Sequence, residues 1–337
     1  MASKGVYIIA EIGPNHNGSF NVAKKMIKEL KNSGVNAIKF QIADPNLVYS
    51  DDSFFANYQK KSGAKSIKQM SIKNQLTYKE HLKLSNLCKR FRIDYLCSAF
   101  DLKSLKFLIT KIKVKKIKIP SGEITSIDLL EYLSKKKNEI LLSTGMSNLY
   151  EIRKAIEKLN KNFKKNITLL HCVSVYPAKK KNLNIKLVKK LKEFFRLKVG
   201  YSDHSIGSEA CLAAVAAGAC VIEKHITLSR KLKGPDHRSS MEINQFKKLI
   251  NKIRELEIIM GTSKKNISVE EQEIKRVSRK SIVTKTFLKK GTVLKKSHLS
   301  FKRPGTGISP MNYNKVIGKK ILRDIKQNKI LKLNNLK

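Results

Sequence analysis

The stretch "VIEKHIT", Val221 to Thr227, ends an apolar run with three ionisable side chains. Glu223 and His225 are two residues apart, so in a strand they share one face. A second histidine, His204, follows the neighbouring apolar run "KVGYSD". A single histidine in such a place is more often a hydrogen-bonded structural group. Two imidazoles on neighbouring strands instead suit a divalent metal ion that keeps positions open for a substrate.

Polar side chains also end the other apolar runs of the chain. Serine hydroxyls and lysine ammonium groups are donors that suit a phosphate or a carboxylate. Each has a simpler explanation, because a lysine at a strand end is usually solvated and a serine can cap the next helix. Their recurrence at every run favours one shared site. These residues are Glu11, Lys39, Gln41, Ser98, Lys118, Ser121, Glu123, Ser143, Thr144, Ser174, Tyr176 and Ser202.

The elements that position these side chains are short runs rich in Val and Ile, alternating with longer amphipathic runs. Eight such units over about 260 residues predict an α/β fold of the (β/α)8 TIM-barrel type, whose chemistry lies at the carboxyl ends of the strands. A doubly wound sheet is the alternative, but no G-x-G-x-x-G follows the first strand. The predicted strands span 6–12, 37–43, 93–100, 114–120, 139–145, 167–176, 198–203 and 220–227.

Two parts of the chain fall outside this repeat. Residues 44–76 are too long for an ordinary loop and predict a lid at the mouth of the barrel. The barrel is expected to span 1–262. Residues 263–277 are polar and predict a linker, and residues 278–337 carry short β runs with glycine turns, which predict a small β-rich domain.

The charge balance raises the question of a nucleic-acid or membrane partner. The 337 residues include 71 Lys and Arg but 26 Asp and Glu, a formal net charge of +45. Lysines run through nearly every segment, however, beside Asn and Ile, and there is no Trp and no helix-turn-helix pattern. We therefore interpret the charge as a composition bias and expect no nucleic-acid partner.

The cysteines and the N-terminus indicate the compartment. The five cysteines form no CxxC pair, and most lie in apolar runs, as free thiols do in a reducing compartment. The N-terminal apolar run is too short for a signal peptide, and no window approaches about eighteen continuous apolar residues. We expect a cytoplasmic protein with no membrane partner.

Lys118 leaves a rival mechanism open. A lysine on a barrel strand can form a Schiff base with a keto substrate, as in aldolases and lyases. Such a lysine needs surroundings that lower its pKa, whereas Ser121 and Lys39 suggest partners that hold an anion.

A series of strings in order along the whole chain resembles the family of N-acetylneuraminate (sialic acid) synthases and their relatives that make legionaminic acid. The C-terminal part resembles the antifreeze-like (SAF) domain of that family, with "KRPGTGI" as its marker. In the barrel, "PSGE" favours this branch over the pseudaminic one. The barrel strings are "AEIGPNHNGS", "IKFQ", "KIPSGEIT", "LSTGM", "LLHCVSVYPA", "VGYSDHSIG", "VIEKHITL" and "GPDHRSSM".

The resemblance implies a metal-dependent condensation of phosphoenolpyruvate with N-acetylmannosamine, or a 2,4-diacetamido-6-deoxy relative, and water. The products would be a nine-carbon 2-keto sugar acid and phosphate. His204 and His225 would hold the divalent metal, Mn2+ before Mg2+ or Co2+, and Glu123 would deprotonate the water. Phosphoenolpyruvate would be held by Lys39, Ser98, Lys118, Ser121, Ser143 and Ser202. The sugar would be contacted by Glu11, Gln41, Asn57, Tyr176 and Asp236.

The resemblance also implies a domain-swapped homodimer, in which Arg303 of "KRPG" reads the N-acetyl group in a partner's site. Two departures concern the shape of the pocket. The third strand has Ser98 and Ala99 where the family often has Thr and Pro, and Ile42 stands where Thr is frequent. Neither departure removes a proposed catalytic group.

Overall fold

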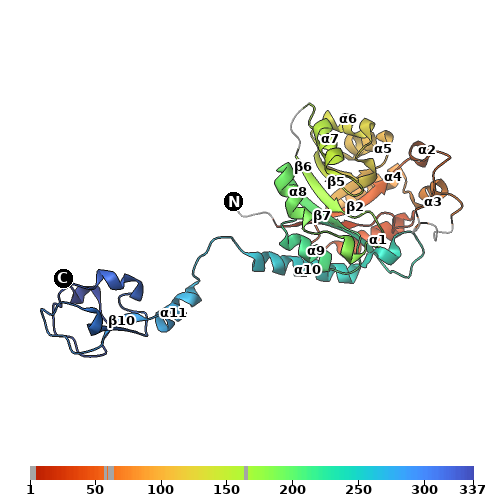
Figure 1. Cartoon of the computed structure of the whole chain (residues 1–337). Helices are drawn as coiled ribbons and strands as arrows, with labels where there is room; N and C mark the ends of the chain where they lie inside the picture. The colour runs from red at the N-terminus through yellow and green to blue at the C-terminus, as the bar shows by residue number, and fades with distance from the viewer. Residues whose placement is uncertain (1–4, 57–58, 60–63, 163–165) are drawn as a thin grey trace. The chain divides into compact units, whose positions relative to one another are not determined.

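The computed structural model describes residues 5–56, 59, 64–162 and 166–337 (Figure 1). The chain forms two compact units, Met1–Gly261 and Thr262–Lys337. Each unit has its own buried apolar core.

The first unit is a closed parallel barrel. Its eight strands pair in chain order, and β1 also pairs with β8, which closes the sheet and confirms the predicted barrel. A short strand, β9 (Met241–Glu242), adds beside the end of β8. The barrel strands are β1 (Tyr7–Glu11), β2 (Ala37–Ile42), β3 (Asp94–Ala99), β4 (Lys116–Ile119), β5 (Glu139–Ser143), β6 (Ile167–Cys172), β7 (Lys198–Asp203) and β8 (Val221–Thr227).

Amphipathic helices cover the outside of the barrel. The first of them shows why: Ser19 caps its start, and Ala23, Met26, Ile27 and Leu30 form one buried face against the strands. Two short helices, α2 and α3, lie in the predicted lid. The helices are α1 (Phe20–Leu30), α2 (Pro45–Val48), α3 (Ile67–Asn74), α4 (Tyr78–Arg90), α5 (Leu102–Phe107), α6 (Ile127–Ser134), α7 (Leu149–Leu159), α8 (Leu187–Phe195), α9 (Glu209–Ala216) and α10 (Ile243–Met260).

The inward face of the strands changes character along the barrel. A separate buried cluster fills the amino-terminal part with Ile9, Ala37, Leu96, Leu141, Leu170 and Val221. Side chains alternate along a strand, so the next position on the same face lies two residues further along. Those next positions are Glu11, Lys39, Ser98, Ser143, Cys172 and Glu223. The lower interior is thus an ordinary apolar core, and the upper interior is mostly polar.

The second unit is small and rich in turns. Strand β10 (Ser281–Thr284) pairs antiparallel with β11 (Leu299–Lys302). Its core is an apolar cluster that includes Ile282, Leu294 and Leu331. The predicted linker 263–277 is not irregular throughout, because helix α11 (Val269–Ser278) occupies much of it.

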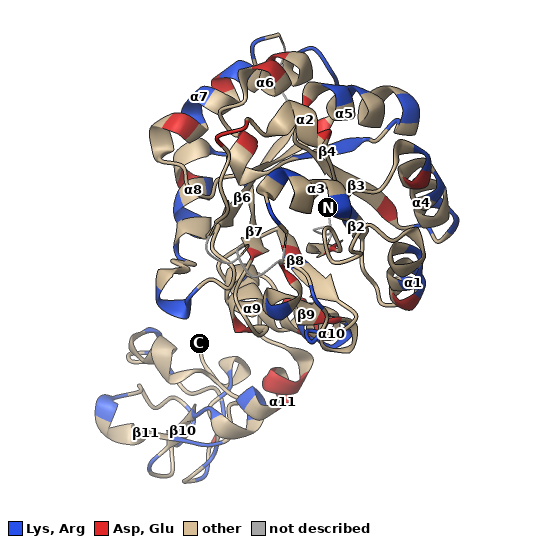
Figure 2. Cartoon of the chain, turned by 90° about the vertical axis from the view of Figure 1, so that its right-hand side faces the viewer, with Lys and Arg blue, Asp and Glu red and all other residues tan. Residues whose placement is uncertain are grey.

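Charged side chains are spread over many elements. Figure 2 shows Lys and Arg on most helices around the barrel and in the second unit as well. In the part of the chain that the structure describes, no helix combines the length and apolar character needed to cross a membrane.

Candidate active site

A cavity of about 370 Å³ opens where the barrel strands end. Because the strands are parallel, their carboxyl ends meet at this one mouth. The cavity brings together most of the predicted site residues. These are Lys39, Gln41, Ser98, Lys118, Ser121, Ser143, Tyr176, Ser202, His204, His225 and Asp236.

Three predicted residues that the structure describes do not line the cavity as expected. Glu11 is fully buried beneath it and contacts Lys39. Glu123 is half-buried beside the lining residues of its own turn. Arg303 is exposed and belongs to the second unit. Asn57 lies outside the described residues.

The floor of the cavity is a cluster of two lysines and two glutamates. Lys118 Nζ donates to Glu223 Oε1 at 2.7 Å, and Ser202 Oγ donates to the same oxygen at 2.9 Å. Lys39 Nζ lies 3.8 Å from Glu223 and donates to Ser98 Oγ at 3.2 Å. The formal charges of the cluster cancel, which makes its burial tolerable. Glu223 therefore supports the two lysines of the floor.

Burial and pairing act in opposite directions on the pKa values in this cluster. Burial lowers the pKa of Lys118, although the Glu223 carboxylate offsets part of that effect. Burial also acts to lower the pKa of Lys39, but Glu11 and Glu223 outweigh it and the net shift is upward. Burial would raise the pKa of Glu223, but Lys118 and Lys39 hold it well below its usual range. Pairing with the glutamates thus offsets part of the cost of burying the two lysines.

Serine hydroxyls from the turns after β4 and β6 line the cavity together with the two lysines. The backbone N–H of Gly145 donates to Ser121 Oγ at 3.1 Å. A side chain at Gly145 would have no room, because an added Cβ would lie 2.3 Å from Ser174 Oγ and 2.8 Å from Ser121 Oγ. The absence of a side chain at Gly145 thus lets these two hydroxyls approach each other. Together with the lysines, they form a surface of donors suited to an anion.

The two histidines stand at one side of the cavity mouth. His204 Nδ1 lies 2.7 Å from the carbonyl oxygen of Val173, and its Nε2 lies 3.0 Å from the Tyr176 hydroxyl. The carbonyl fixes the hydrogen on Nδ1, so Nε2 keeps its lone pair. Burial lowers the pKa of His204 to about 4 and that of His225 well below its usual range.

This pair fits a divalent metal ion in its chemistry. The ring centroids of His204 and His225 are 5.5 Å apart, and both rings are neutral, as ligands must be. His225 Nδ1 lies 3.5 Å from Asp236 Oδ2, without a hydrogen bond between the two. Among the described residues, no further His, Cys, Asp or Glu joins the pair in a cluster of three.

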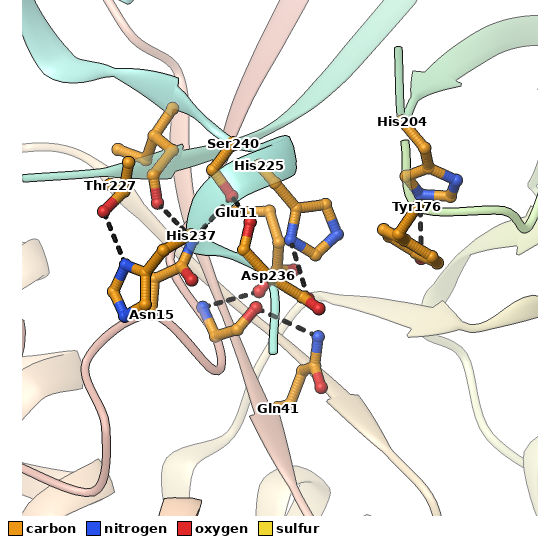
Figure 3. Close-up of polar contacts among 12 residues, drawn as sticks. Glu11, Asn15, Gln41, Tyr176, His204, His225, Thr227, Asp236, His237 and Ser240 are labelled. Carbon is orange, nitrogen blue, oxygen red and sulfur yellow. Dashed lines mark hydrogen bonds and ion pairs between the residues drawn. The ribbon is translucent and has the colours of Figure 1, made fainter. Parts of the chain in front are cut away.

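Three of the residues predicted to contact a sugar, Glu11, Gln41 and Asp236, lie on the β1–β2–β8 side (Figure 3). Glu11 Oε1 accepts from the Gly13 N–H at 2.7 Å, and Gln41 Nε2 donates to the Gly13 carbonyl at 3.1 Å. Asp236 is buried at the cavity wall, and burial raises its pKa to about 7. This side of the cavity therefore offers oxygen and amide groups that can receive hydroxyls.

Glu123 closes the short turn η3 (Ser121–Glu123). Its carboxylate accepts a hydrogen bond from the Ser126 hydroxyl, and burial raises its pKa. A carboxyl whose pKa is raised is a better proton acceptor. Its role with water stays a prediction, because its side chain is not part of the cavity wall.

Lys224 points away from the site. It is buried and contacts Asp203 and the carbonyl of Ser205 on the other side of the barrel wall. The alternation of a strand explains this, because Lys224 lies between the inward Glu223 and His225. Lys224 thus belongs to a structural ion pair.

The lid contributes more to the cavity than the motifs indicated. Only Asn57 was predicted there, yet many described lid residues line the wall. Chain length located the segment, but its short helices have no periodicity strong enough to select the inward side chains. The lining lid residues are Val48, Tyr49, Ala56, Gln59, Met70, Ser71, Asn74 and Gln75.

The fold and the cavity define a (β/α)8-barrel protein with a polar, ligand-sized site at the carboxyl ends of its strands. The particular family follows from comparison with known proteins. The chain belongs to the NeuB family, whose model matches residues 26–265, and a SAF domain matches residues 279–337. These matches confirm the resemblance that the motifs indicated.

Relatives of this chain match over nearly their whole length. The N,N'-diacetyllegionaminic acid synthase of Campylobacter jejuni is 42% identical over 98% of this chain and 99% of its own. That of Legionella pneumophila is 38% identical over 95% of this chain and 91% of its own. The crystal structure of a sialic acid synthetase from Leptospira borgpetersenii is 34% identical, with a TM-score of 0.71 over 80% of this chain and 90% of that one.

Proposed function

We propose that this protein condenses phosphoenolpyruvate with an N-acetylated mannosamine-type sugar and water, giving a nine-carbon 2-keto sugar acid and inorganic phosphate. The observation that carries the proposal is the 42% identity with an N,N'-diacetyllegionaminic acid synthase over nearly both whole chains. We therefore take 2,4-diacetamido-2,4,6-trideoxymannose as the acceptor. The likeness to a sialic acid synthetase makes N-acetylmannosamine the second candidate.

Phosphoenolpyruvate would lie on the floor of the cavity. Lys39 and Lys118 supply cations there, and the hydroxyls of Ser98, Ser121, Ser143 and Ser202 supply further donors. Such a set matches the phosphate and the carboxylate of this substrate. The sugar would lie above it, between the Glu11 and Gln41 side and Tyr176, with Asp236 at the wall.

The reaction forms one carbon–carbon bond and breaks one carbon–oxygen bond. The C3 atom of phosphoenolpyruvate bonds to the aldehyde carbon of the open-chain sugar, whose oxygen takes up a proton. Water adds to C2, and Glu123 accepts its proton. The bond from C2 to the phosphate oxygen then breaks, which leaves the ketone and releases phosphate. The raised pKa of Glu123 supports this role.

The proposal includes a divalent metal ion held by His204 and His225, with Mn2+ preferred over Mg2+ or Co2+. When bound, the ion would polarise the aldehyde oxygen of the sugar. The neutral rings and their 5.5 Å separation support this assignment. Two imidazoles leave most positions of an ion open to substrate and water.

The assembly in this proposal is a domain-swapped homodimer in the cytoplasm. Arg303 of one subunit would read the N-acetyl group of the sugar in the other subunit's cavity. The Arg303 side chain is exposed, which leaves it able to reach a neighbouring subunit. The free thiols of the five cysteines support a reducing compartment.

The experiment that tests the function is phosphate release from phosphoenolpyruvate by the purified protein with Mn2+. It is run with each of the two sugars, and each reaction has an EDTA control. Release with the diacetamido sugar that EDTA stops is the expected result. Release that survives EDTA, together with borohydride trapping of pyruvate on Lys118, would instead support the Schiff-base alternative.

A further inference from the structure

A set of hydrogen bonds, most of them buried, joins the loop after β1 to the turn that carries Asp236 (Figure 3). We call this set the clasp; it consists of Asn15, Asn17, Thr227, His237 and Ser240. The strings "GPNHNG" and "GPDHRSS" contain four of these residues. None of the five has a role in the reaction proposed above.

The first half of the clasp is a relay that begins at Asn15. Its Nδ2 donates to the carbonyl oxygen of Ile226 at 2.8 Å and to Ser240 Oγ at 2.7 Å. Ser240 Oγ in turn donates to the main-chain oxygen of Asp236 at 2.7 Å. Asn15 is 1% exposed and Ser240 3%, so water does not compete for these bonds.

The second half is centred on the fully buried ring of His237. Its Nδ1 lies 2.7 Å from Thr227 Oγ1 on β8, and its Nε2 lies 3.2 Å from Asn17 Oδ1. Asn17 Nδ2 also donates to the carbonyl of Lys233 at 3.0 Å. The loop after β1 thus holds the turn after β8 at two separate points.

The clasp holds the loop between β8 and β9, which has little regular secondary structure. Between β8 and β9, the short turn η5 (His237–Ser239) is the one regular element. Fixing such a loop during sugar binding would cost conformational entropy for each residue ordered. The clasp orders it beforehand, with Asp236 Oδ2 set 3.5 Å from His225 Nδ1. Asn15 also holds Ile226, the residue directly after His225.

We infer that Asn15 and Ser240 are positioning residues for the acceptor sugar, acting through Asp236 and His225. Neither lines the cavity, so neither touches the substrate directly. The inference rests on the proposed function for its substrate. A merely structural role would affect both substrates, whereas here sugar binding should weaken and binding of phosphoenolpyruvate on the floor of the cavity should not.

The first test is Ser240→Ala, with Ser239→Ala as its matched control. Ser239 is the preceding residue, is also buried at 8% exposure, and lies outside the relay. Ser240→Ala should raise the KM for the sugar about fivefold to tenfold and change the KM for phosphoenolpyruvate by less than about twofold, the effect of losing one buried hydrogen bond. Ser239→Ala should match the wild type. Equal sugar KM values in the two variants would overturn the inference.

A second readout does not depend on turnover. Hydrogen exchange of the backbone amides of residues 229–241 should be faster in Ser240→Ala than in Ser239→Ala, with the rest of the barrel unchanged. The double variant Asn15→Ala/Ser240→Ala should lose no more sugar affinity than Asn15→Ala alone, because both residues belong to one relay. If the wild type turns over neither sugar, the proposed function fails, and the exchange comparison still decides whether the clasp holds Asp236.

Discussion

Lys118 and Glu223 show how a single buried pair can contribute to both stability and function. Each side chain is 3% exposed, and their polar atoms are 2.7 Å apart. Neither charge could remain there alone, since removing one partner of a buried pair leaves an uncompensated charge. The same pairing opposes the effect of burial on the pKa of the lysine, at the place where an anion is expected.

Lys118→Met should lower the free energy of unfolding by about 3 kcal/mol and abolish turnover, because Glu223 is left without its nearest partner. Adding Glu223→Gln should restore most of the stability but none of the activity. Urea denaturation followed by circular dichroism gives the first quantity, and phosphate release gives the second. A single variant as stable as the wild type would contradict the assignment of this pair.

The double change His204→Ala and His225→Ala should reduce turnover by about a thousandfold or more, if the two rings hold the catalytic ion. The fold should persist, because the apolar core of the barrel lies elsewhere. Phosphate release and equilibrium dialysis with Mn2+ measure the two effects. His298→Ala, which removes an imidazole from the second unit, is the control. Full activity in the double variant would exclude the metal role.

The turn after β5 is shaped by the absence of a side chain at Gly145. Gly145→Ala should displace Ser174 or Ser121 and raise the KM for phosphoenolpyruvate about tenfold, since the new Cβ would lie 2.3 Å and 2.8 Å from their oxygens. Gly122→Ala adds the same methyl group near the cavity but meets nothing within 4 Å, which makes it the matched comparison. Similar KM values in both variants would show that the serines do not need this approach.

Helix α4 packs a neutral histidine against the barrel. His81 contacts Phe40 and Tyr95, and burial lowers its pKa to about 3. The unfolded chain takes up a proton near pH 6.5, whereas the folded chain does not. Stability is therefore complete above pH 6.5 and decreases as the pH falls from 6.5 toward 3, by up to about 1.4 kcal/mol per pH unit for this group.

Thermal unfolding between pH 7.5 and 4.5 tests this expectation. The melting temperature should fall on the acid side in the wild type and fall less steeply in His81→Gln, where this titration is absent. Parallel curves for the two proteins would show that His81 does not contribute to the acid dependence.

The sequence was most informative about the strands. All eight lie within the predicted runs, and β7 spans the same residues, because parallel strands buried on both faces read as short apolar runs. Helix α11 was missed. Its start signal was local, a capping box between Ser268 and Glu271, but its apolar side chains Val269, Ile274 and Val277 remain exposed and give no core-facing pattern.

Site residues, too, could be predicted only where a local pattern of the sequence indicates them. Lys39, Lys118 and His225 could be found because the period of a strand assigns them to one face at one end. Asn15 and His237 were missed because their roles depend on contacts across more than two hundred residues of sequence, which no local pattern shows. The ion pairs of the cavity floor, such as Lys118 with Glu223, likewise could not be predicted, because they form only in the folded structure.

The surplus of positive charge lies outside the buried site. The floor cluster is neutral overall, so the formal charge of +45 belongs to the rest of the chain. A strongly positive surface attracts anions at long range and does so less at high salt. For an enzyme with an anionic substrate, this attraction raises the rate at which substrate and enzyme meet and does not affect the fold.

The proposed exchange of domains predicts complementation between two inactive chains. Arg303→Ala and His225→Ala should each be nearly inactive alone. The isolated mixed dimers should recover about half of wild-type activity, because one of the two sites in each hybrid then has an intact barrel and an intact Arg303. Coexpression with two affinity tags isolates these hybrids. If they remain inactive, Arg303 does not act across subunits.

The change of character along the inward face of the strands bears on how such a protein can diverge. Substitutions at Leu96 or Leu141 affect whether the chain folds, whereas substitutions at Ser98 or Ser143, two residues further along, alter what the mouth can hold. Inheritable variation in substrate choice can therefore accumulate in the upper layer while the lower layer stays under separate selection for stability. A lineage built on this barrel can acquire a new acceptor sugar while every intermediate sequence still folds.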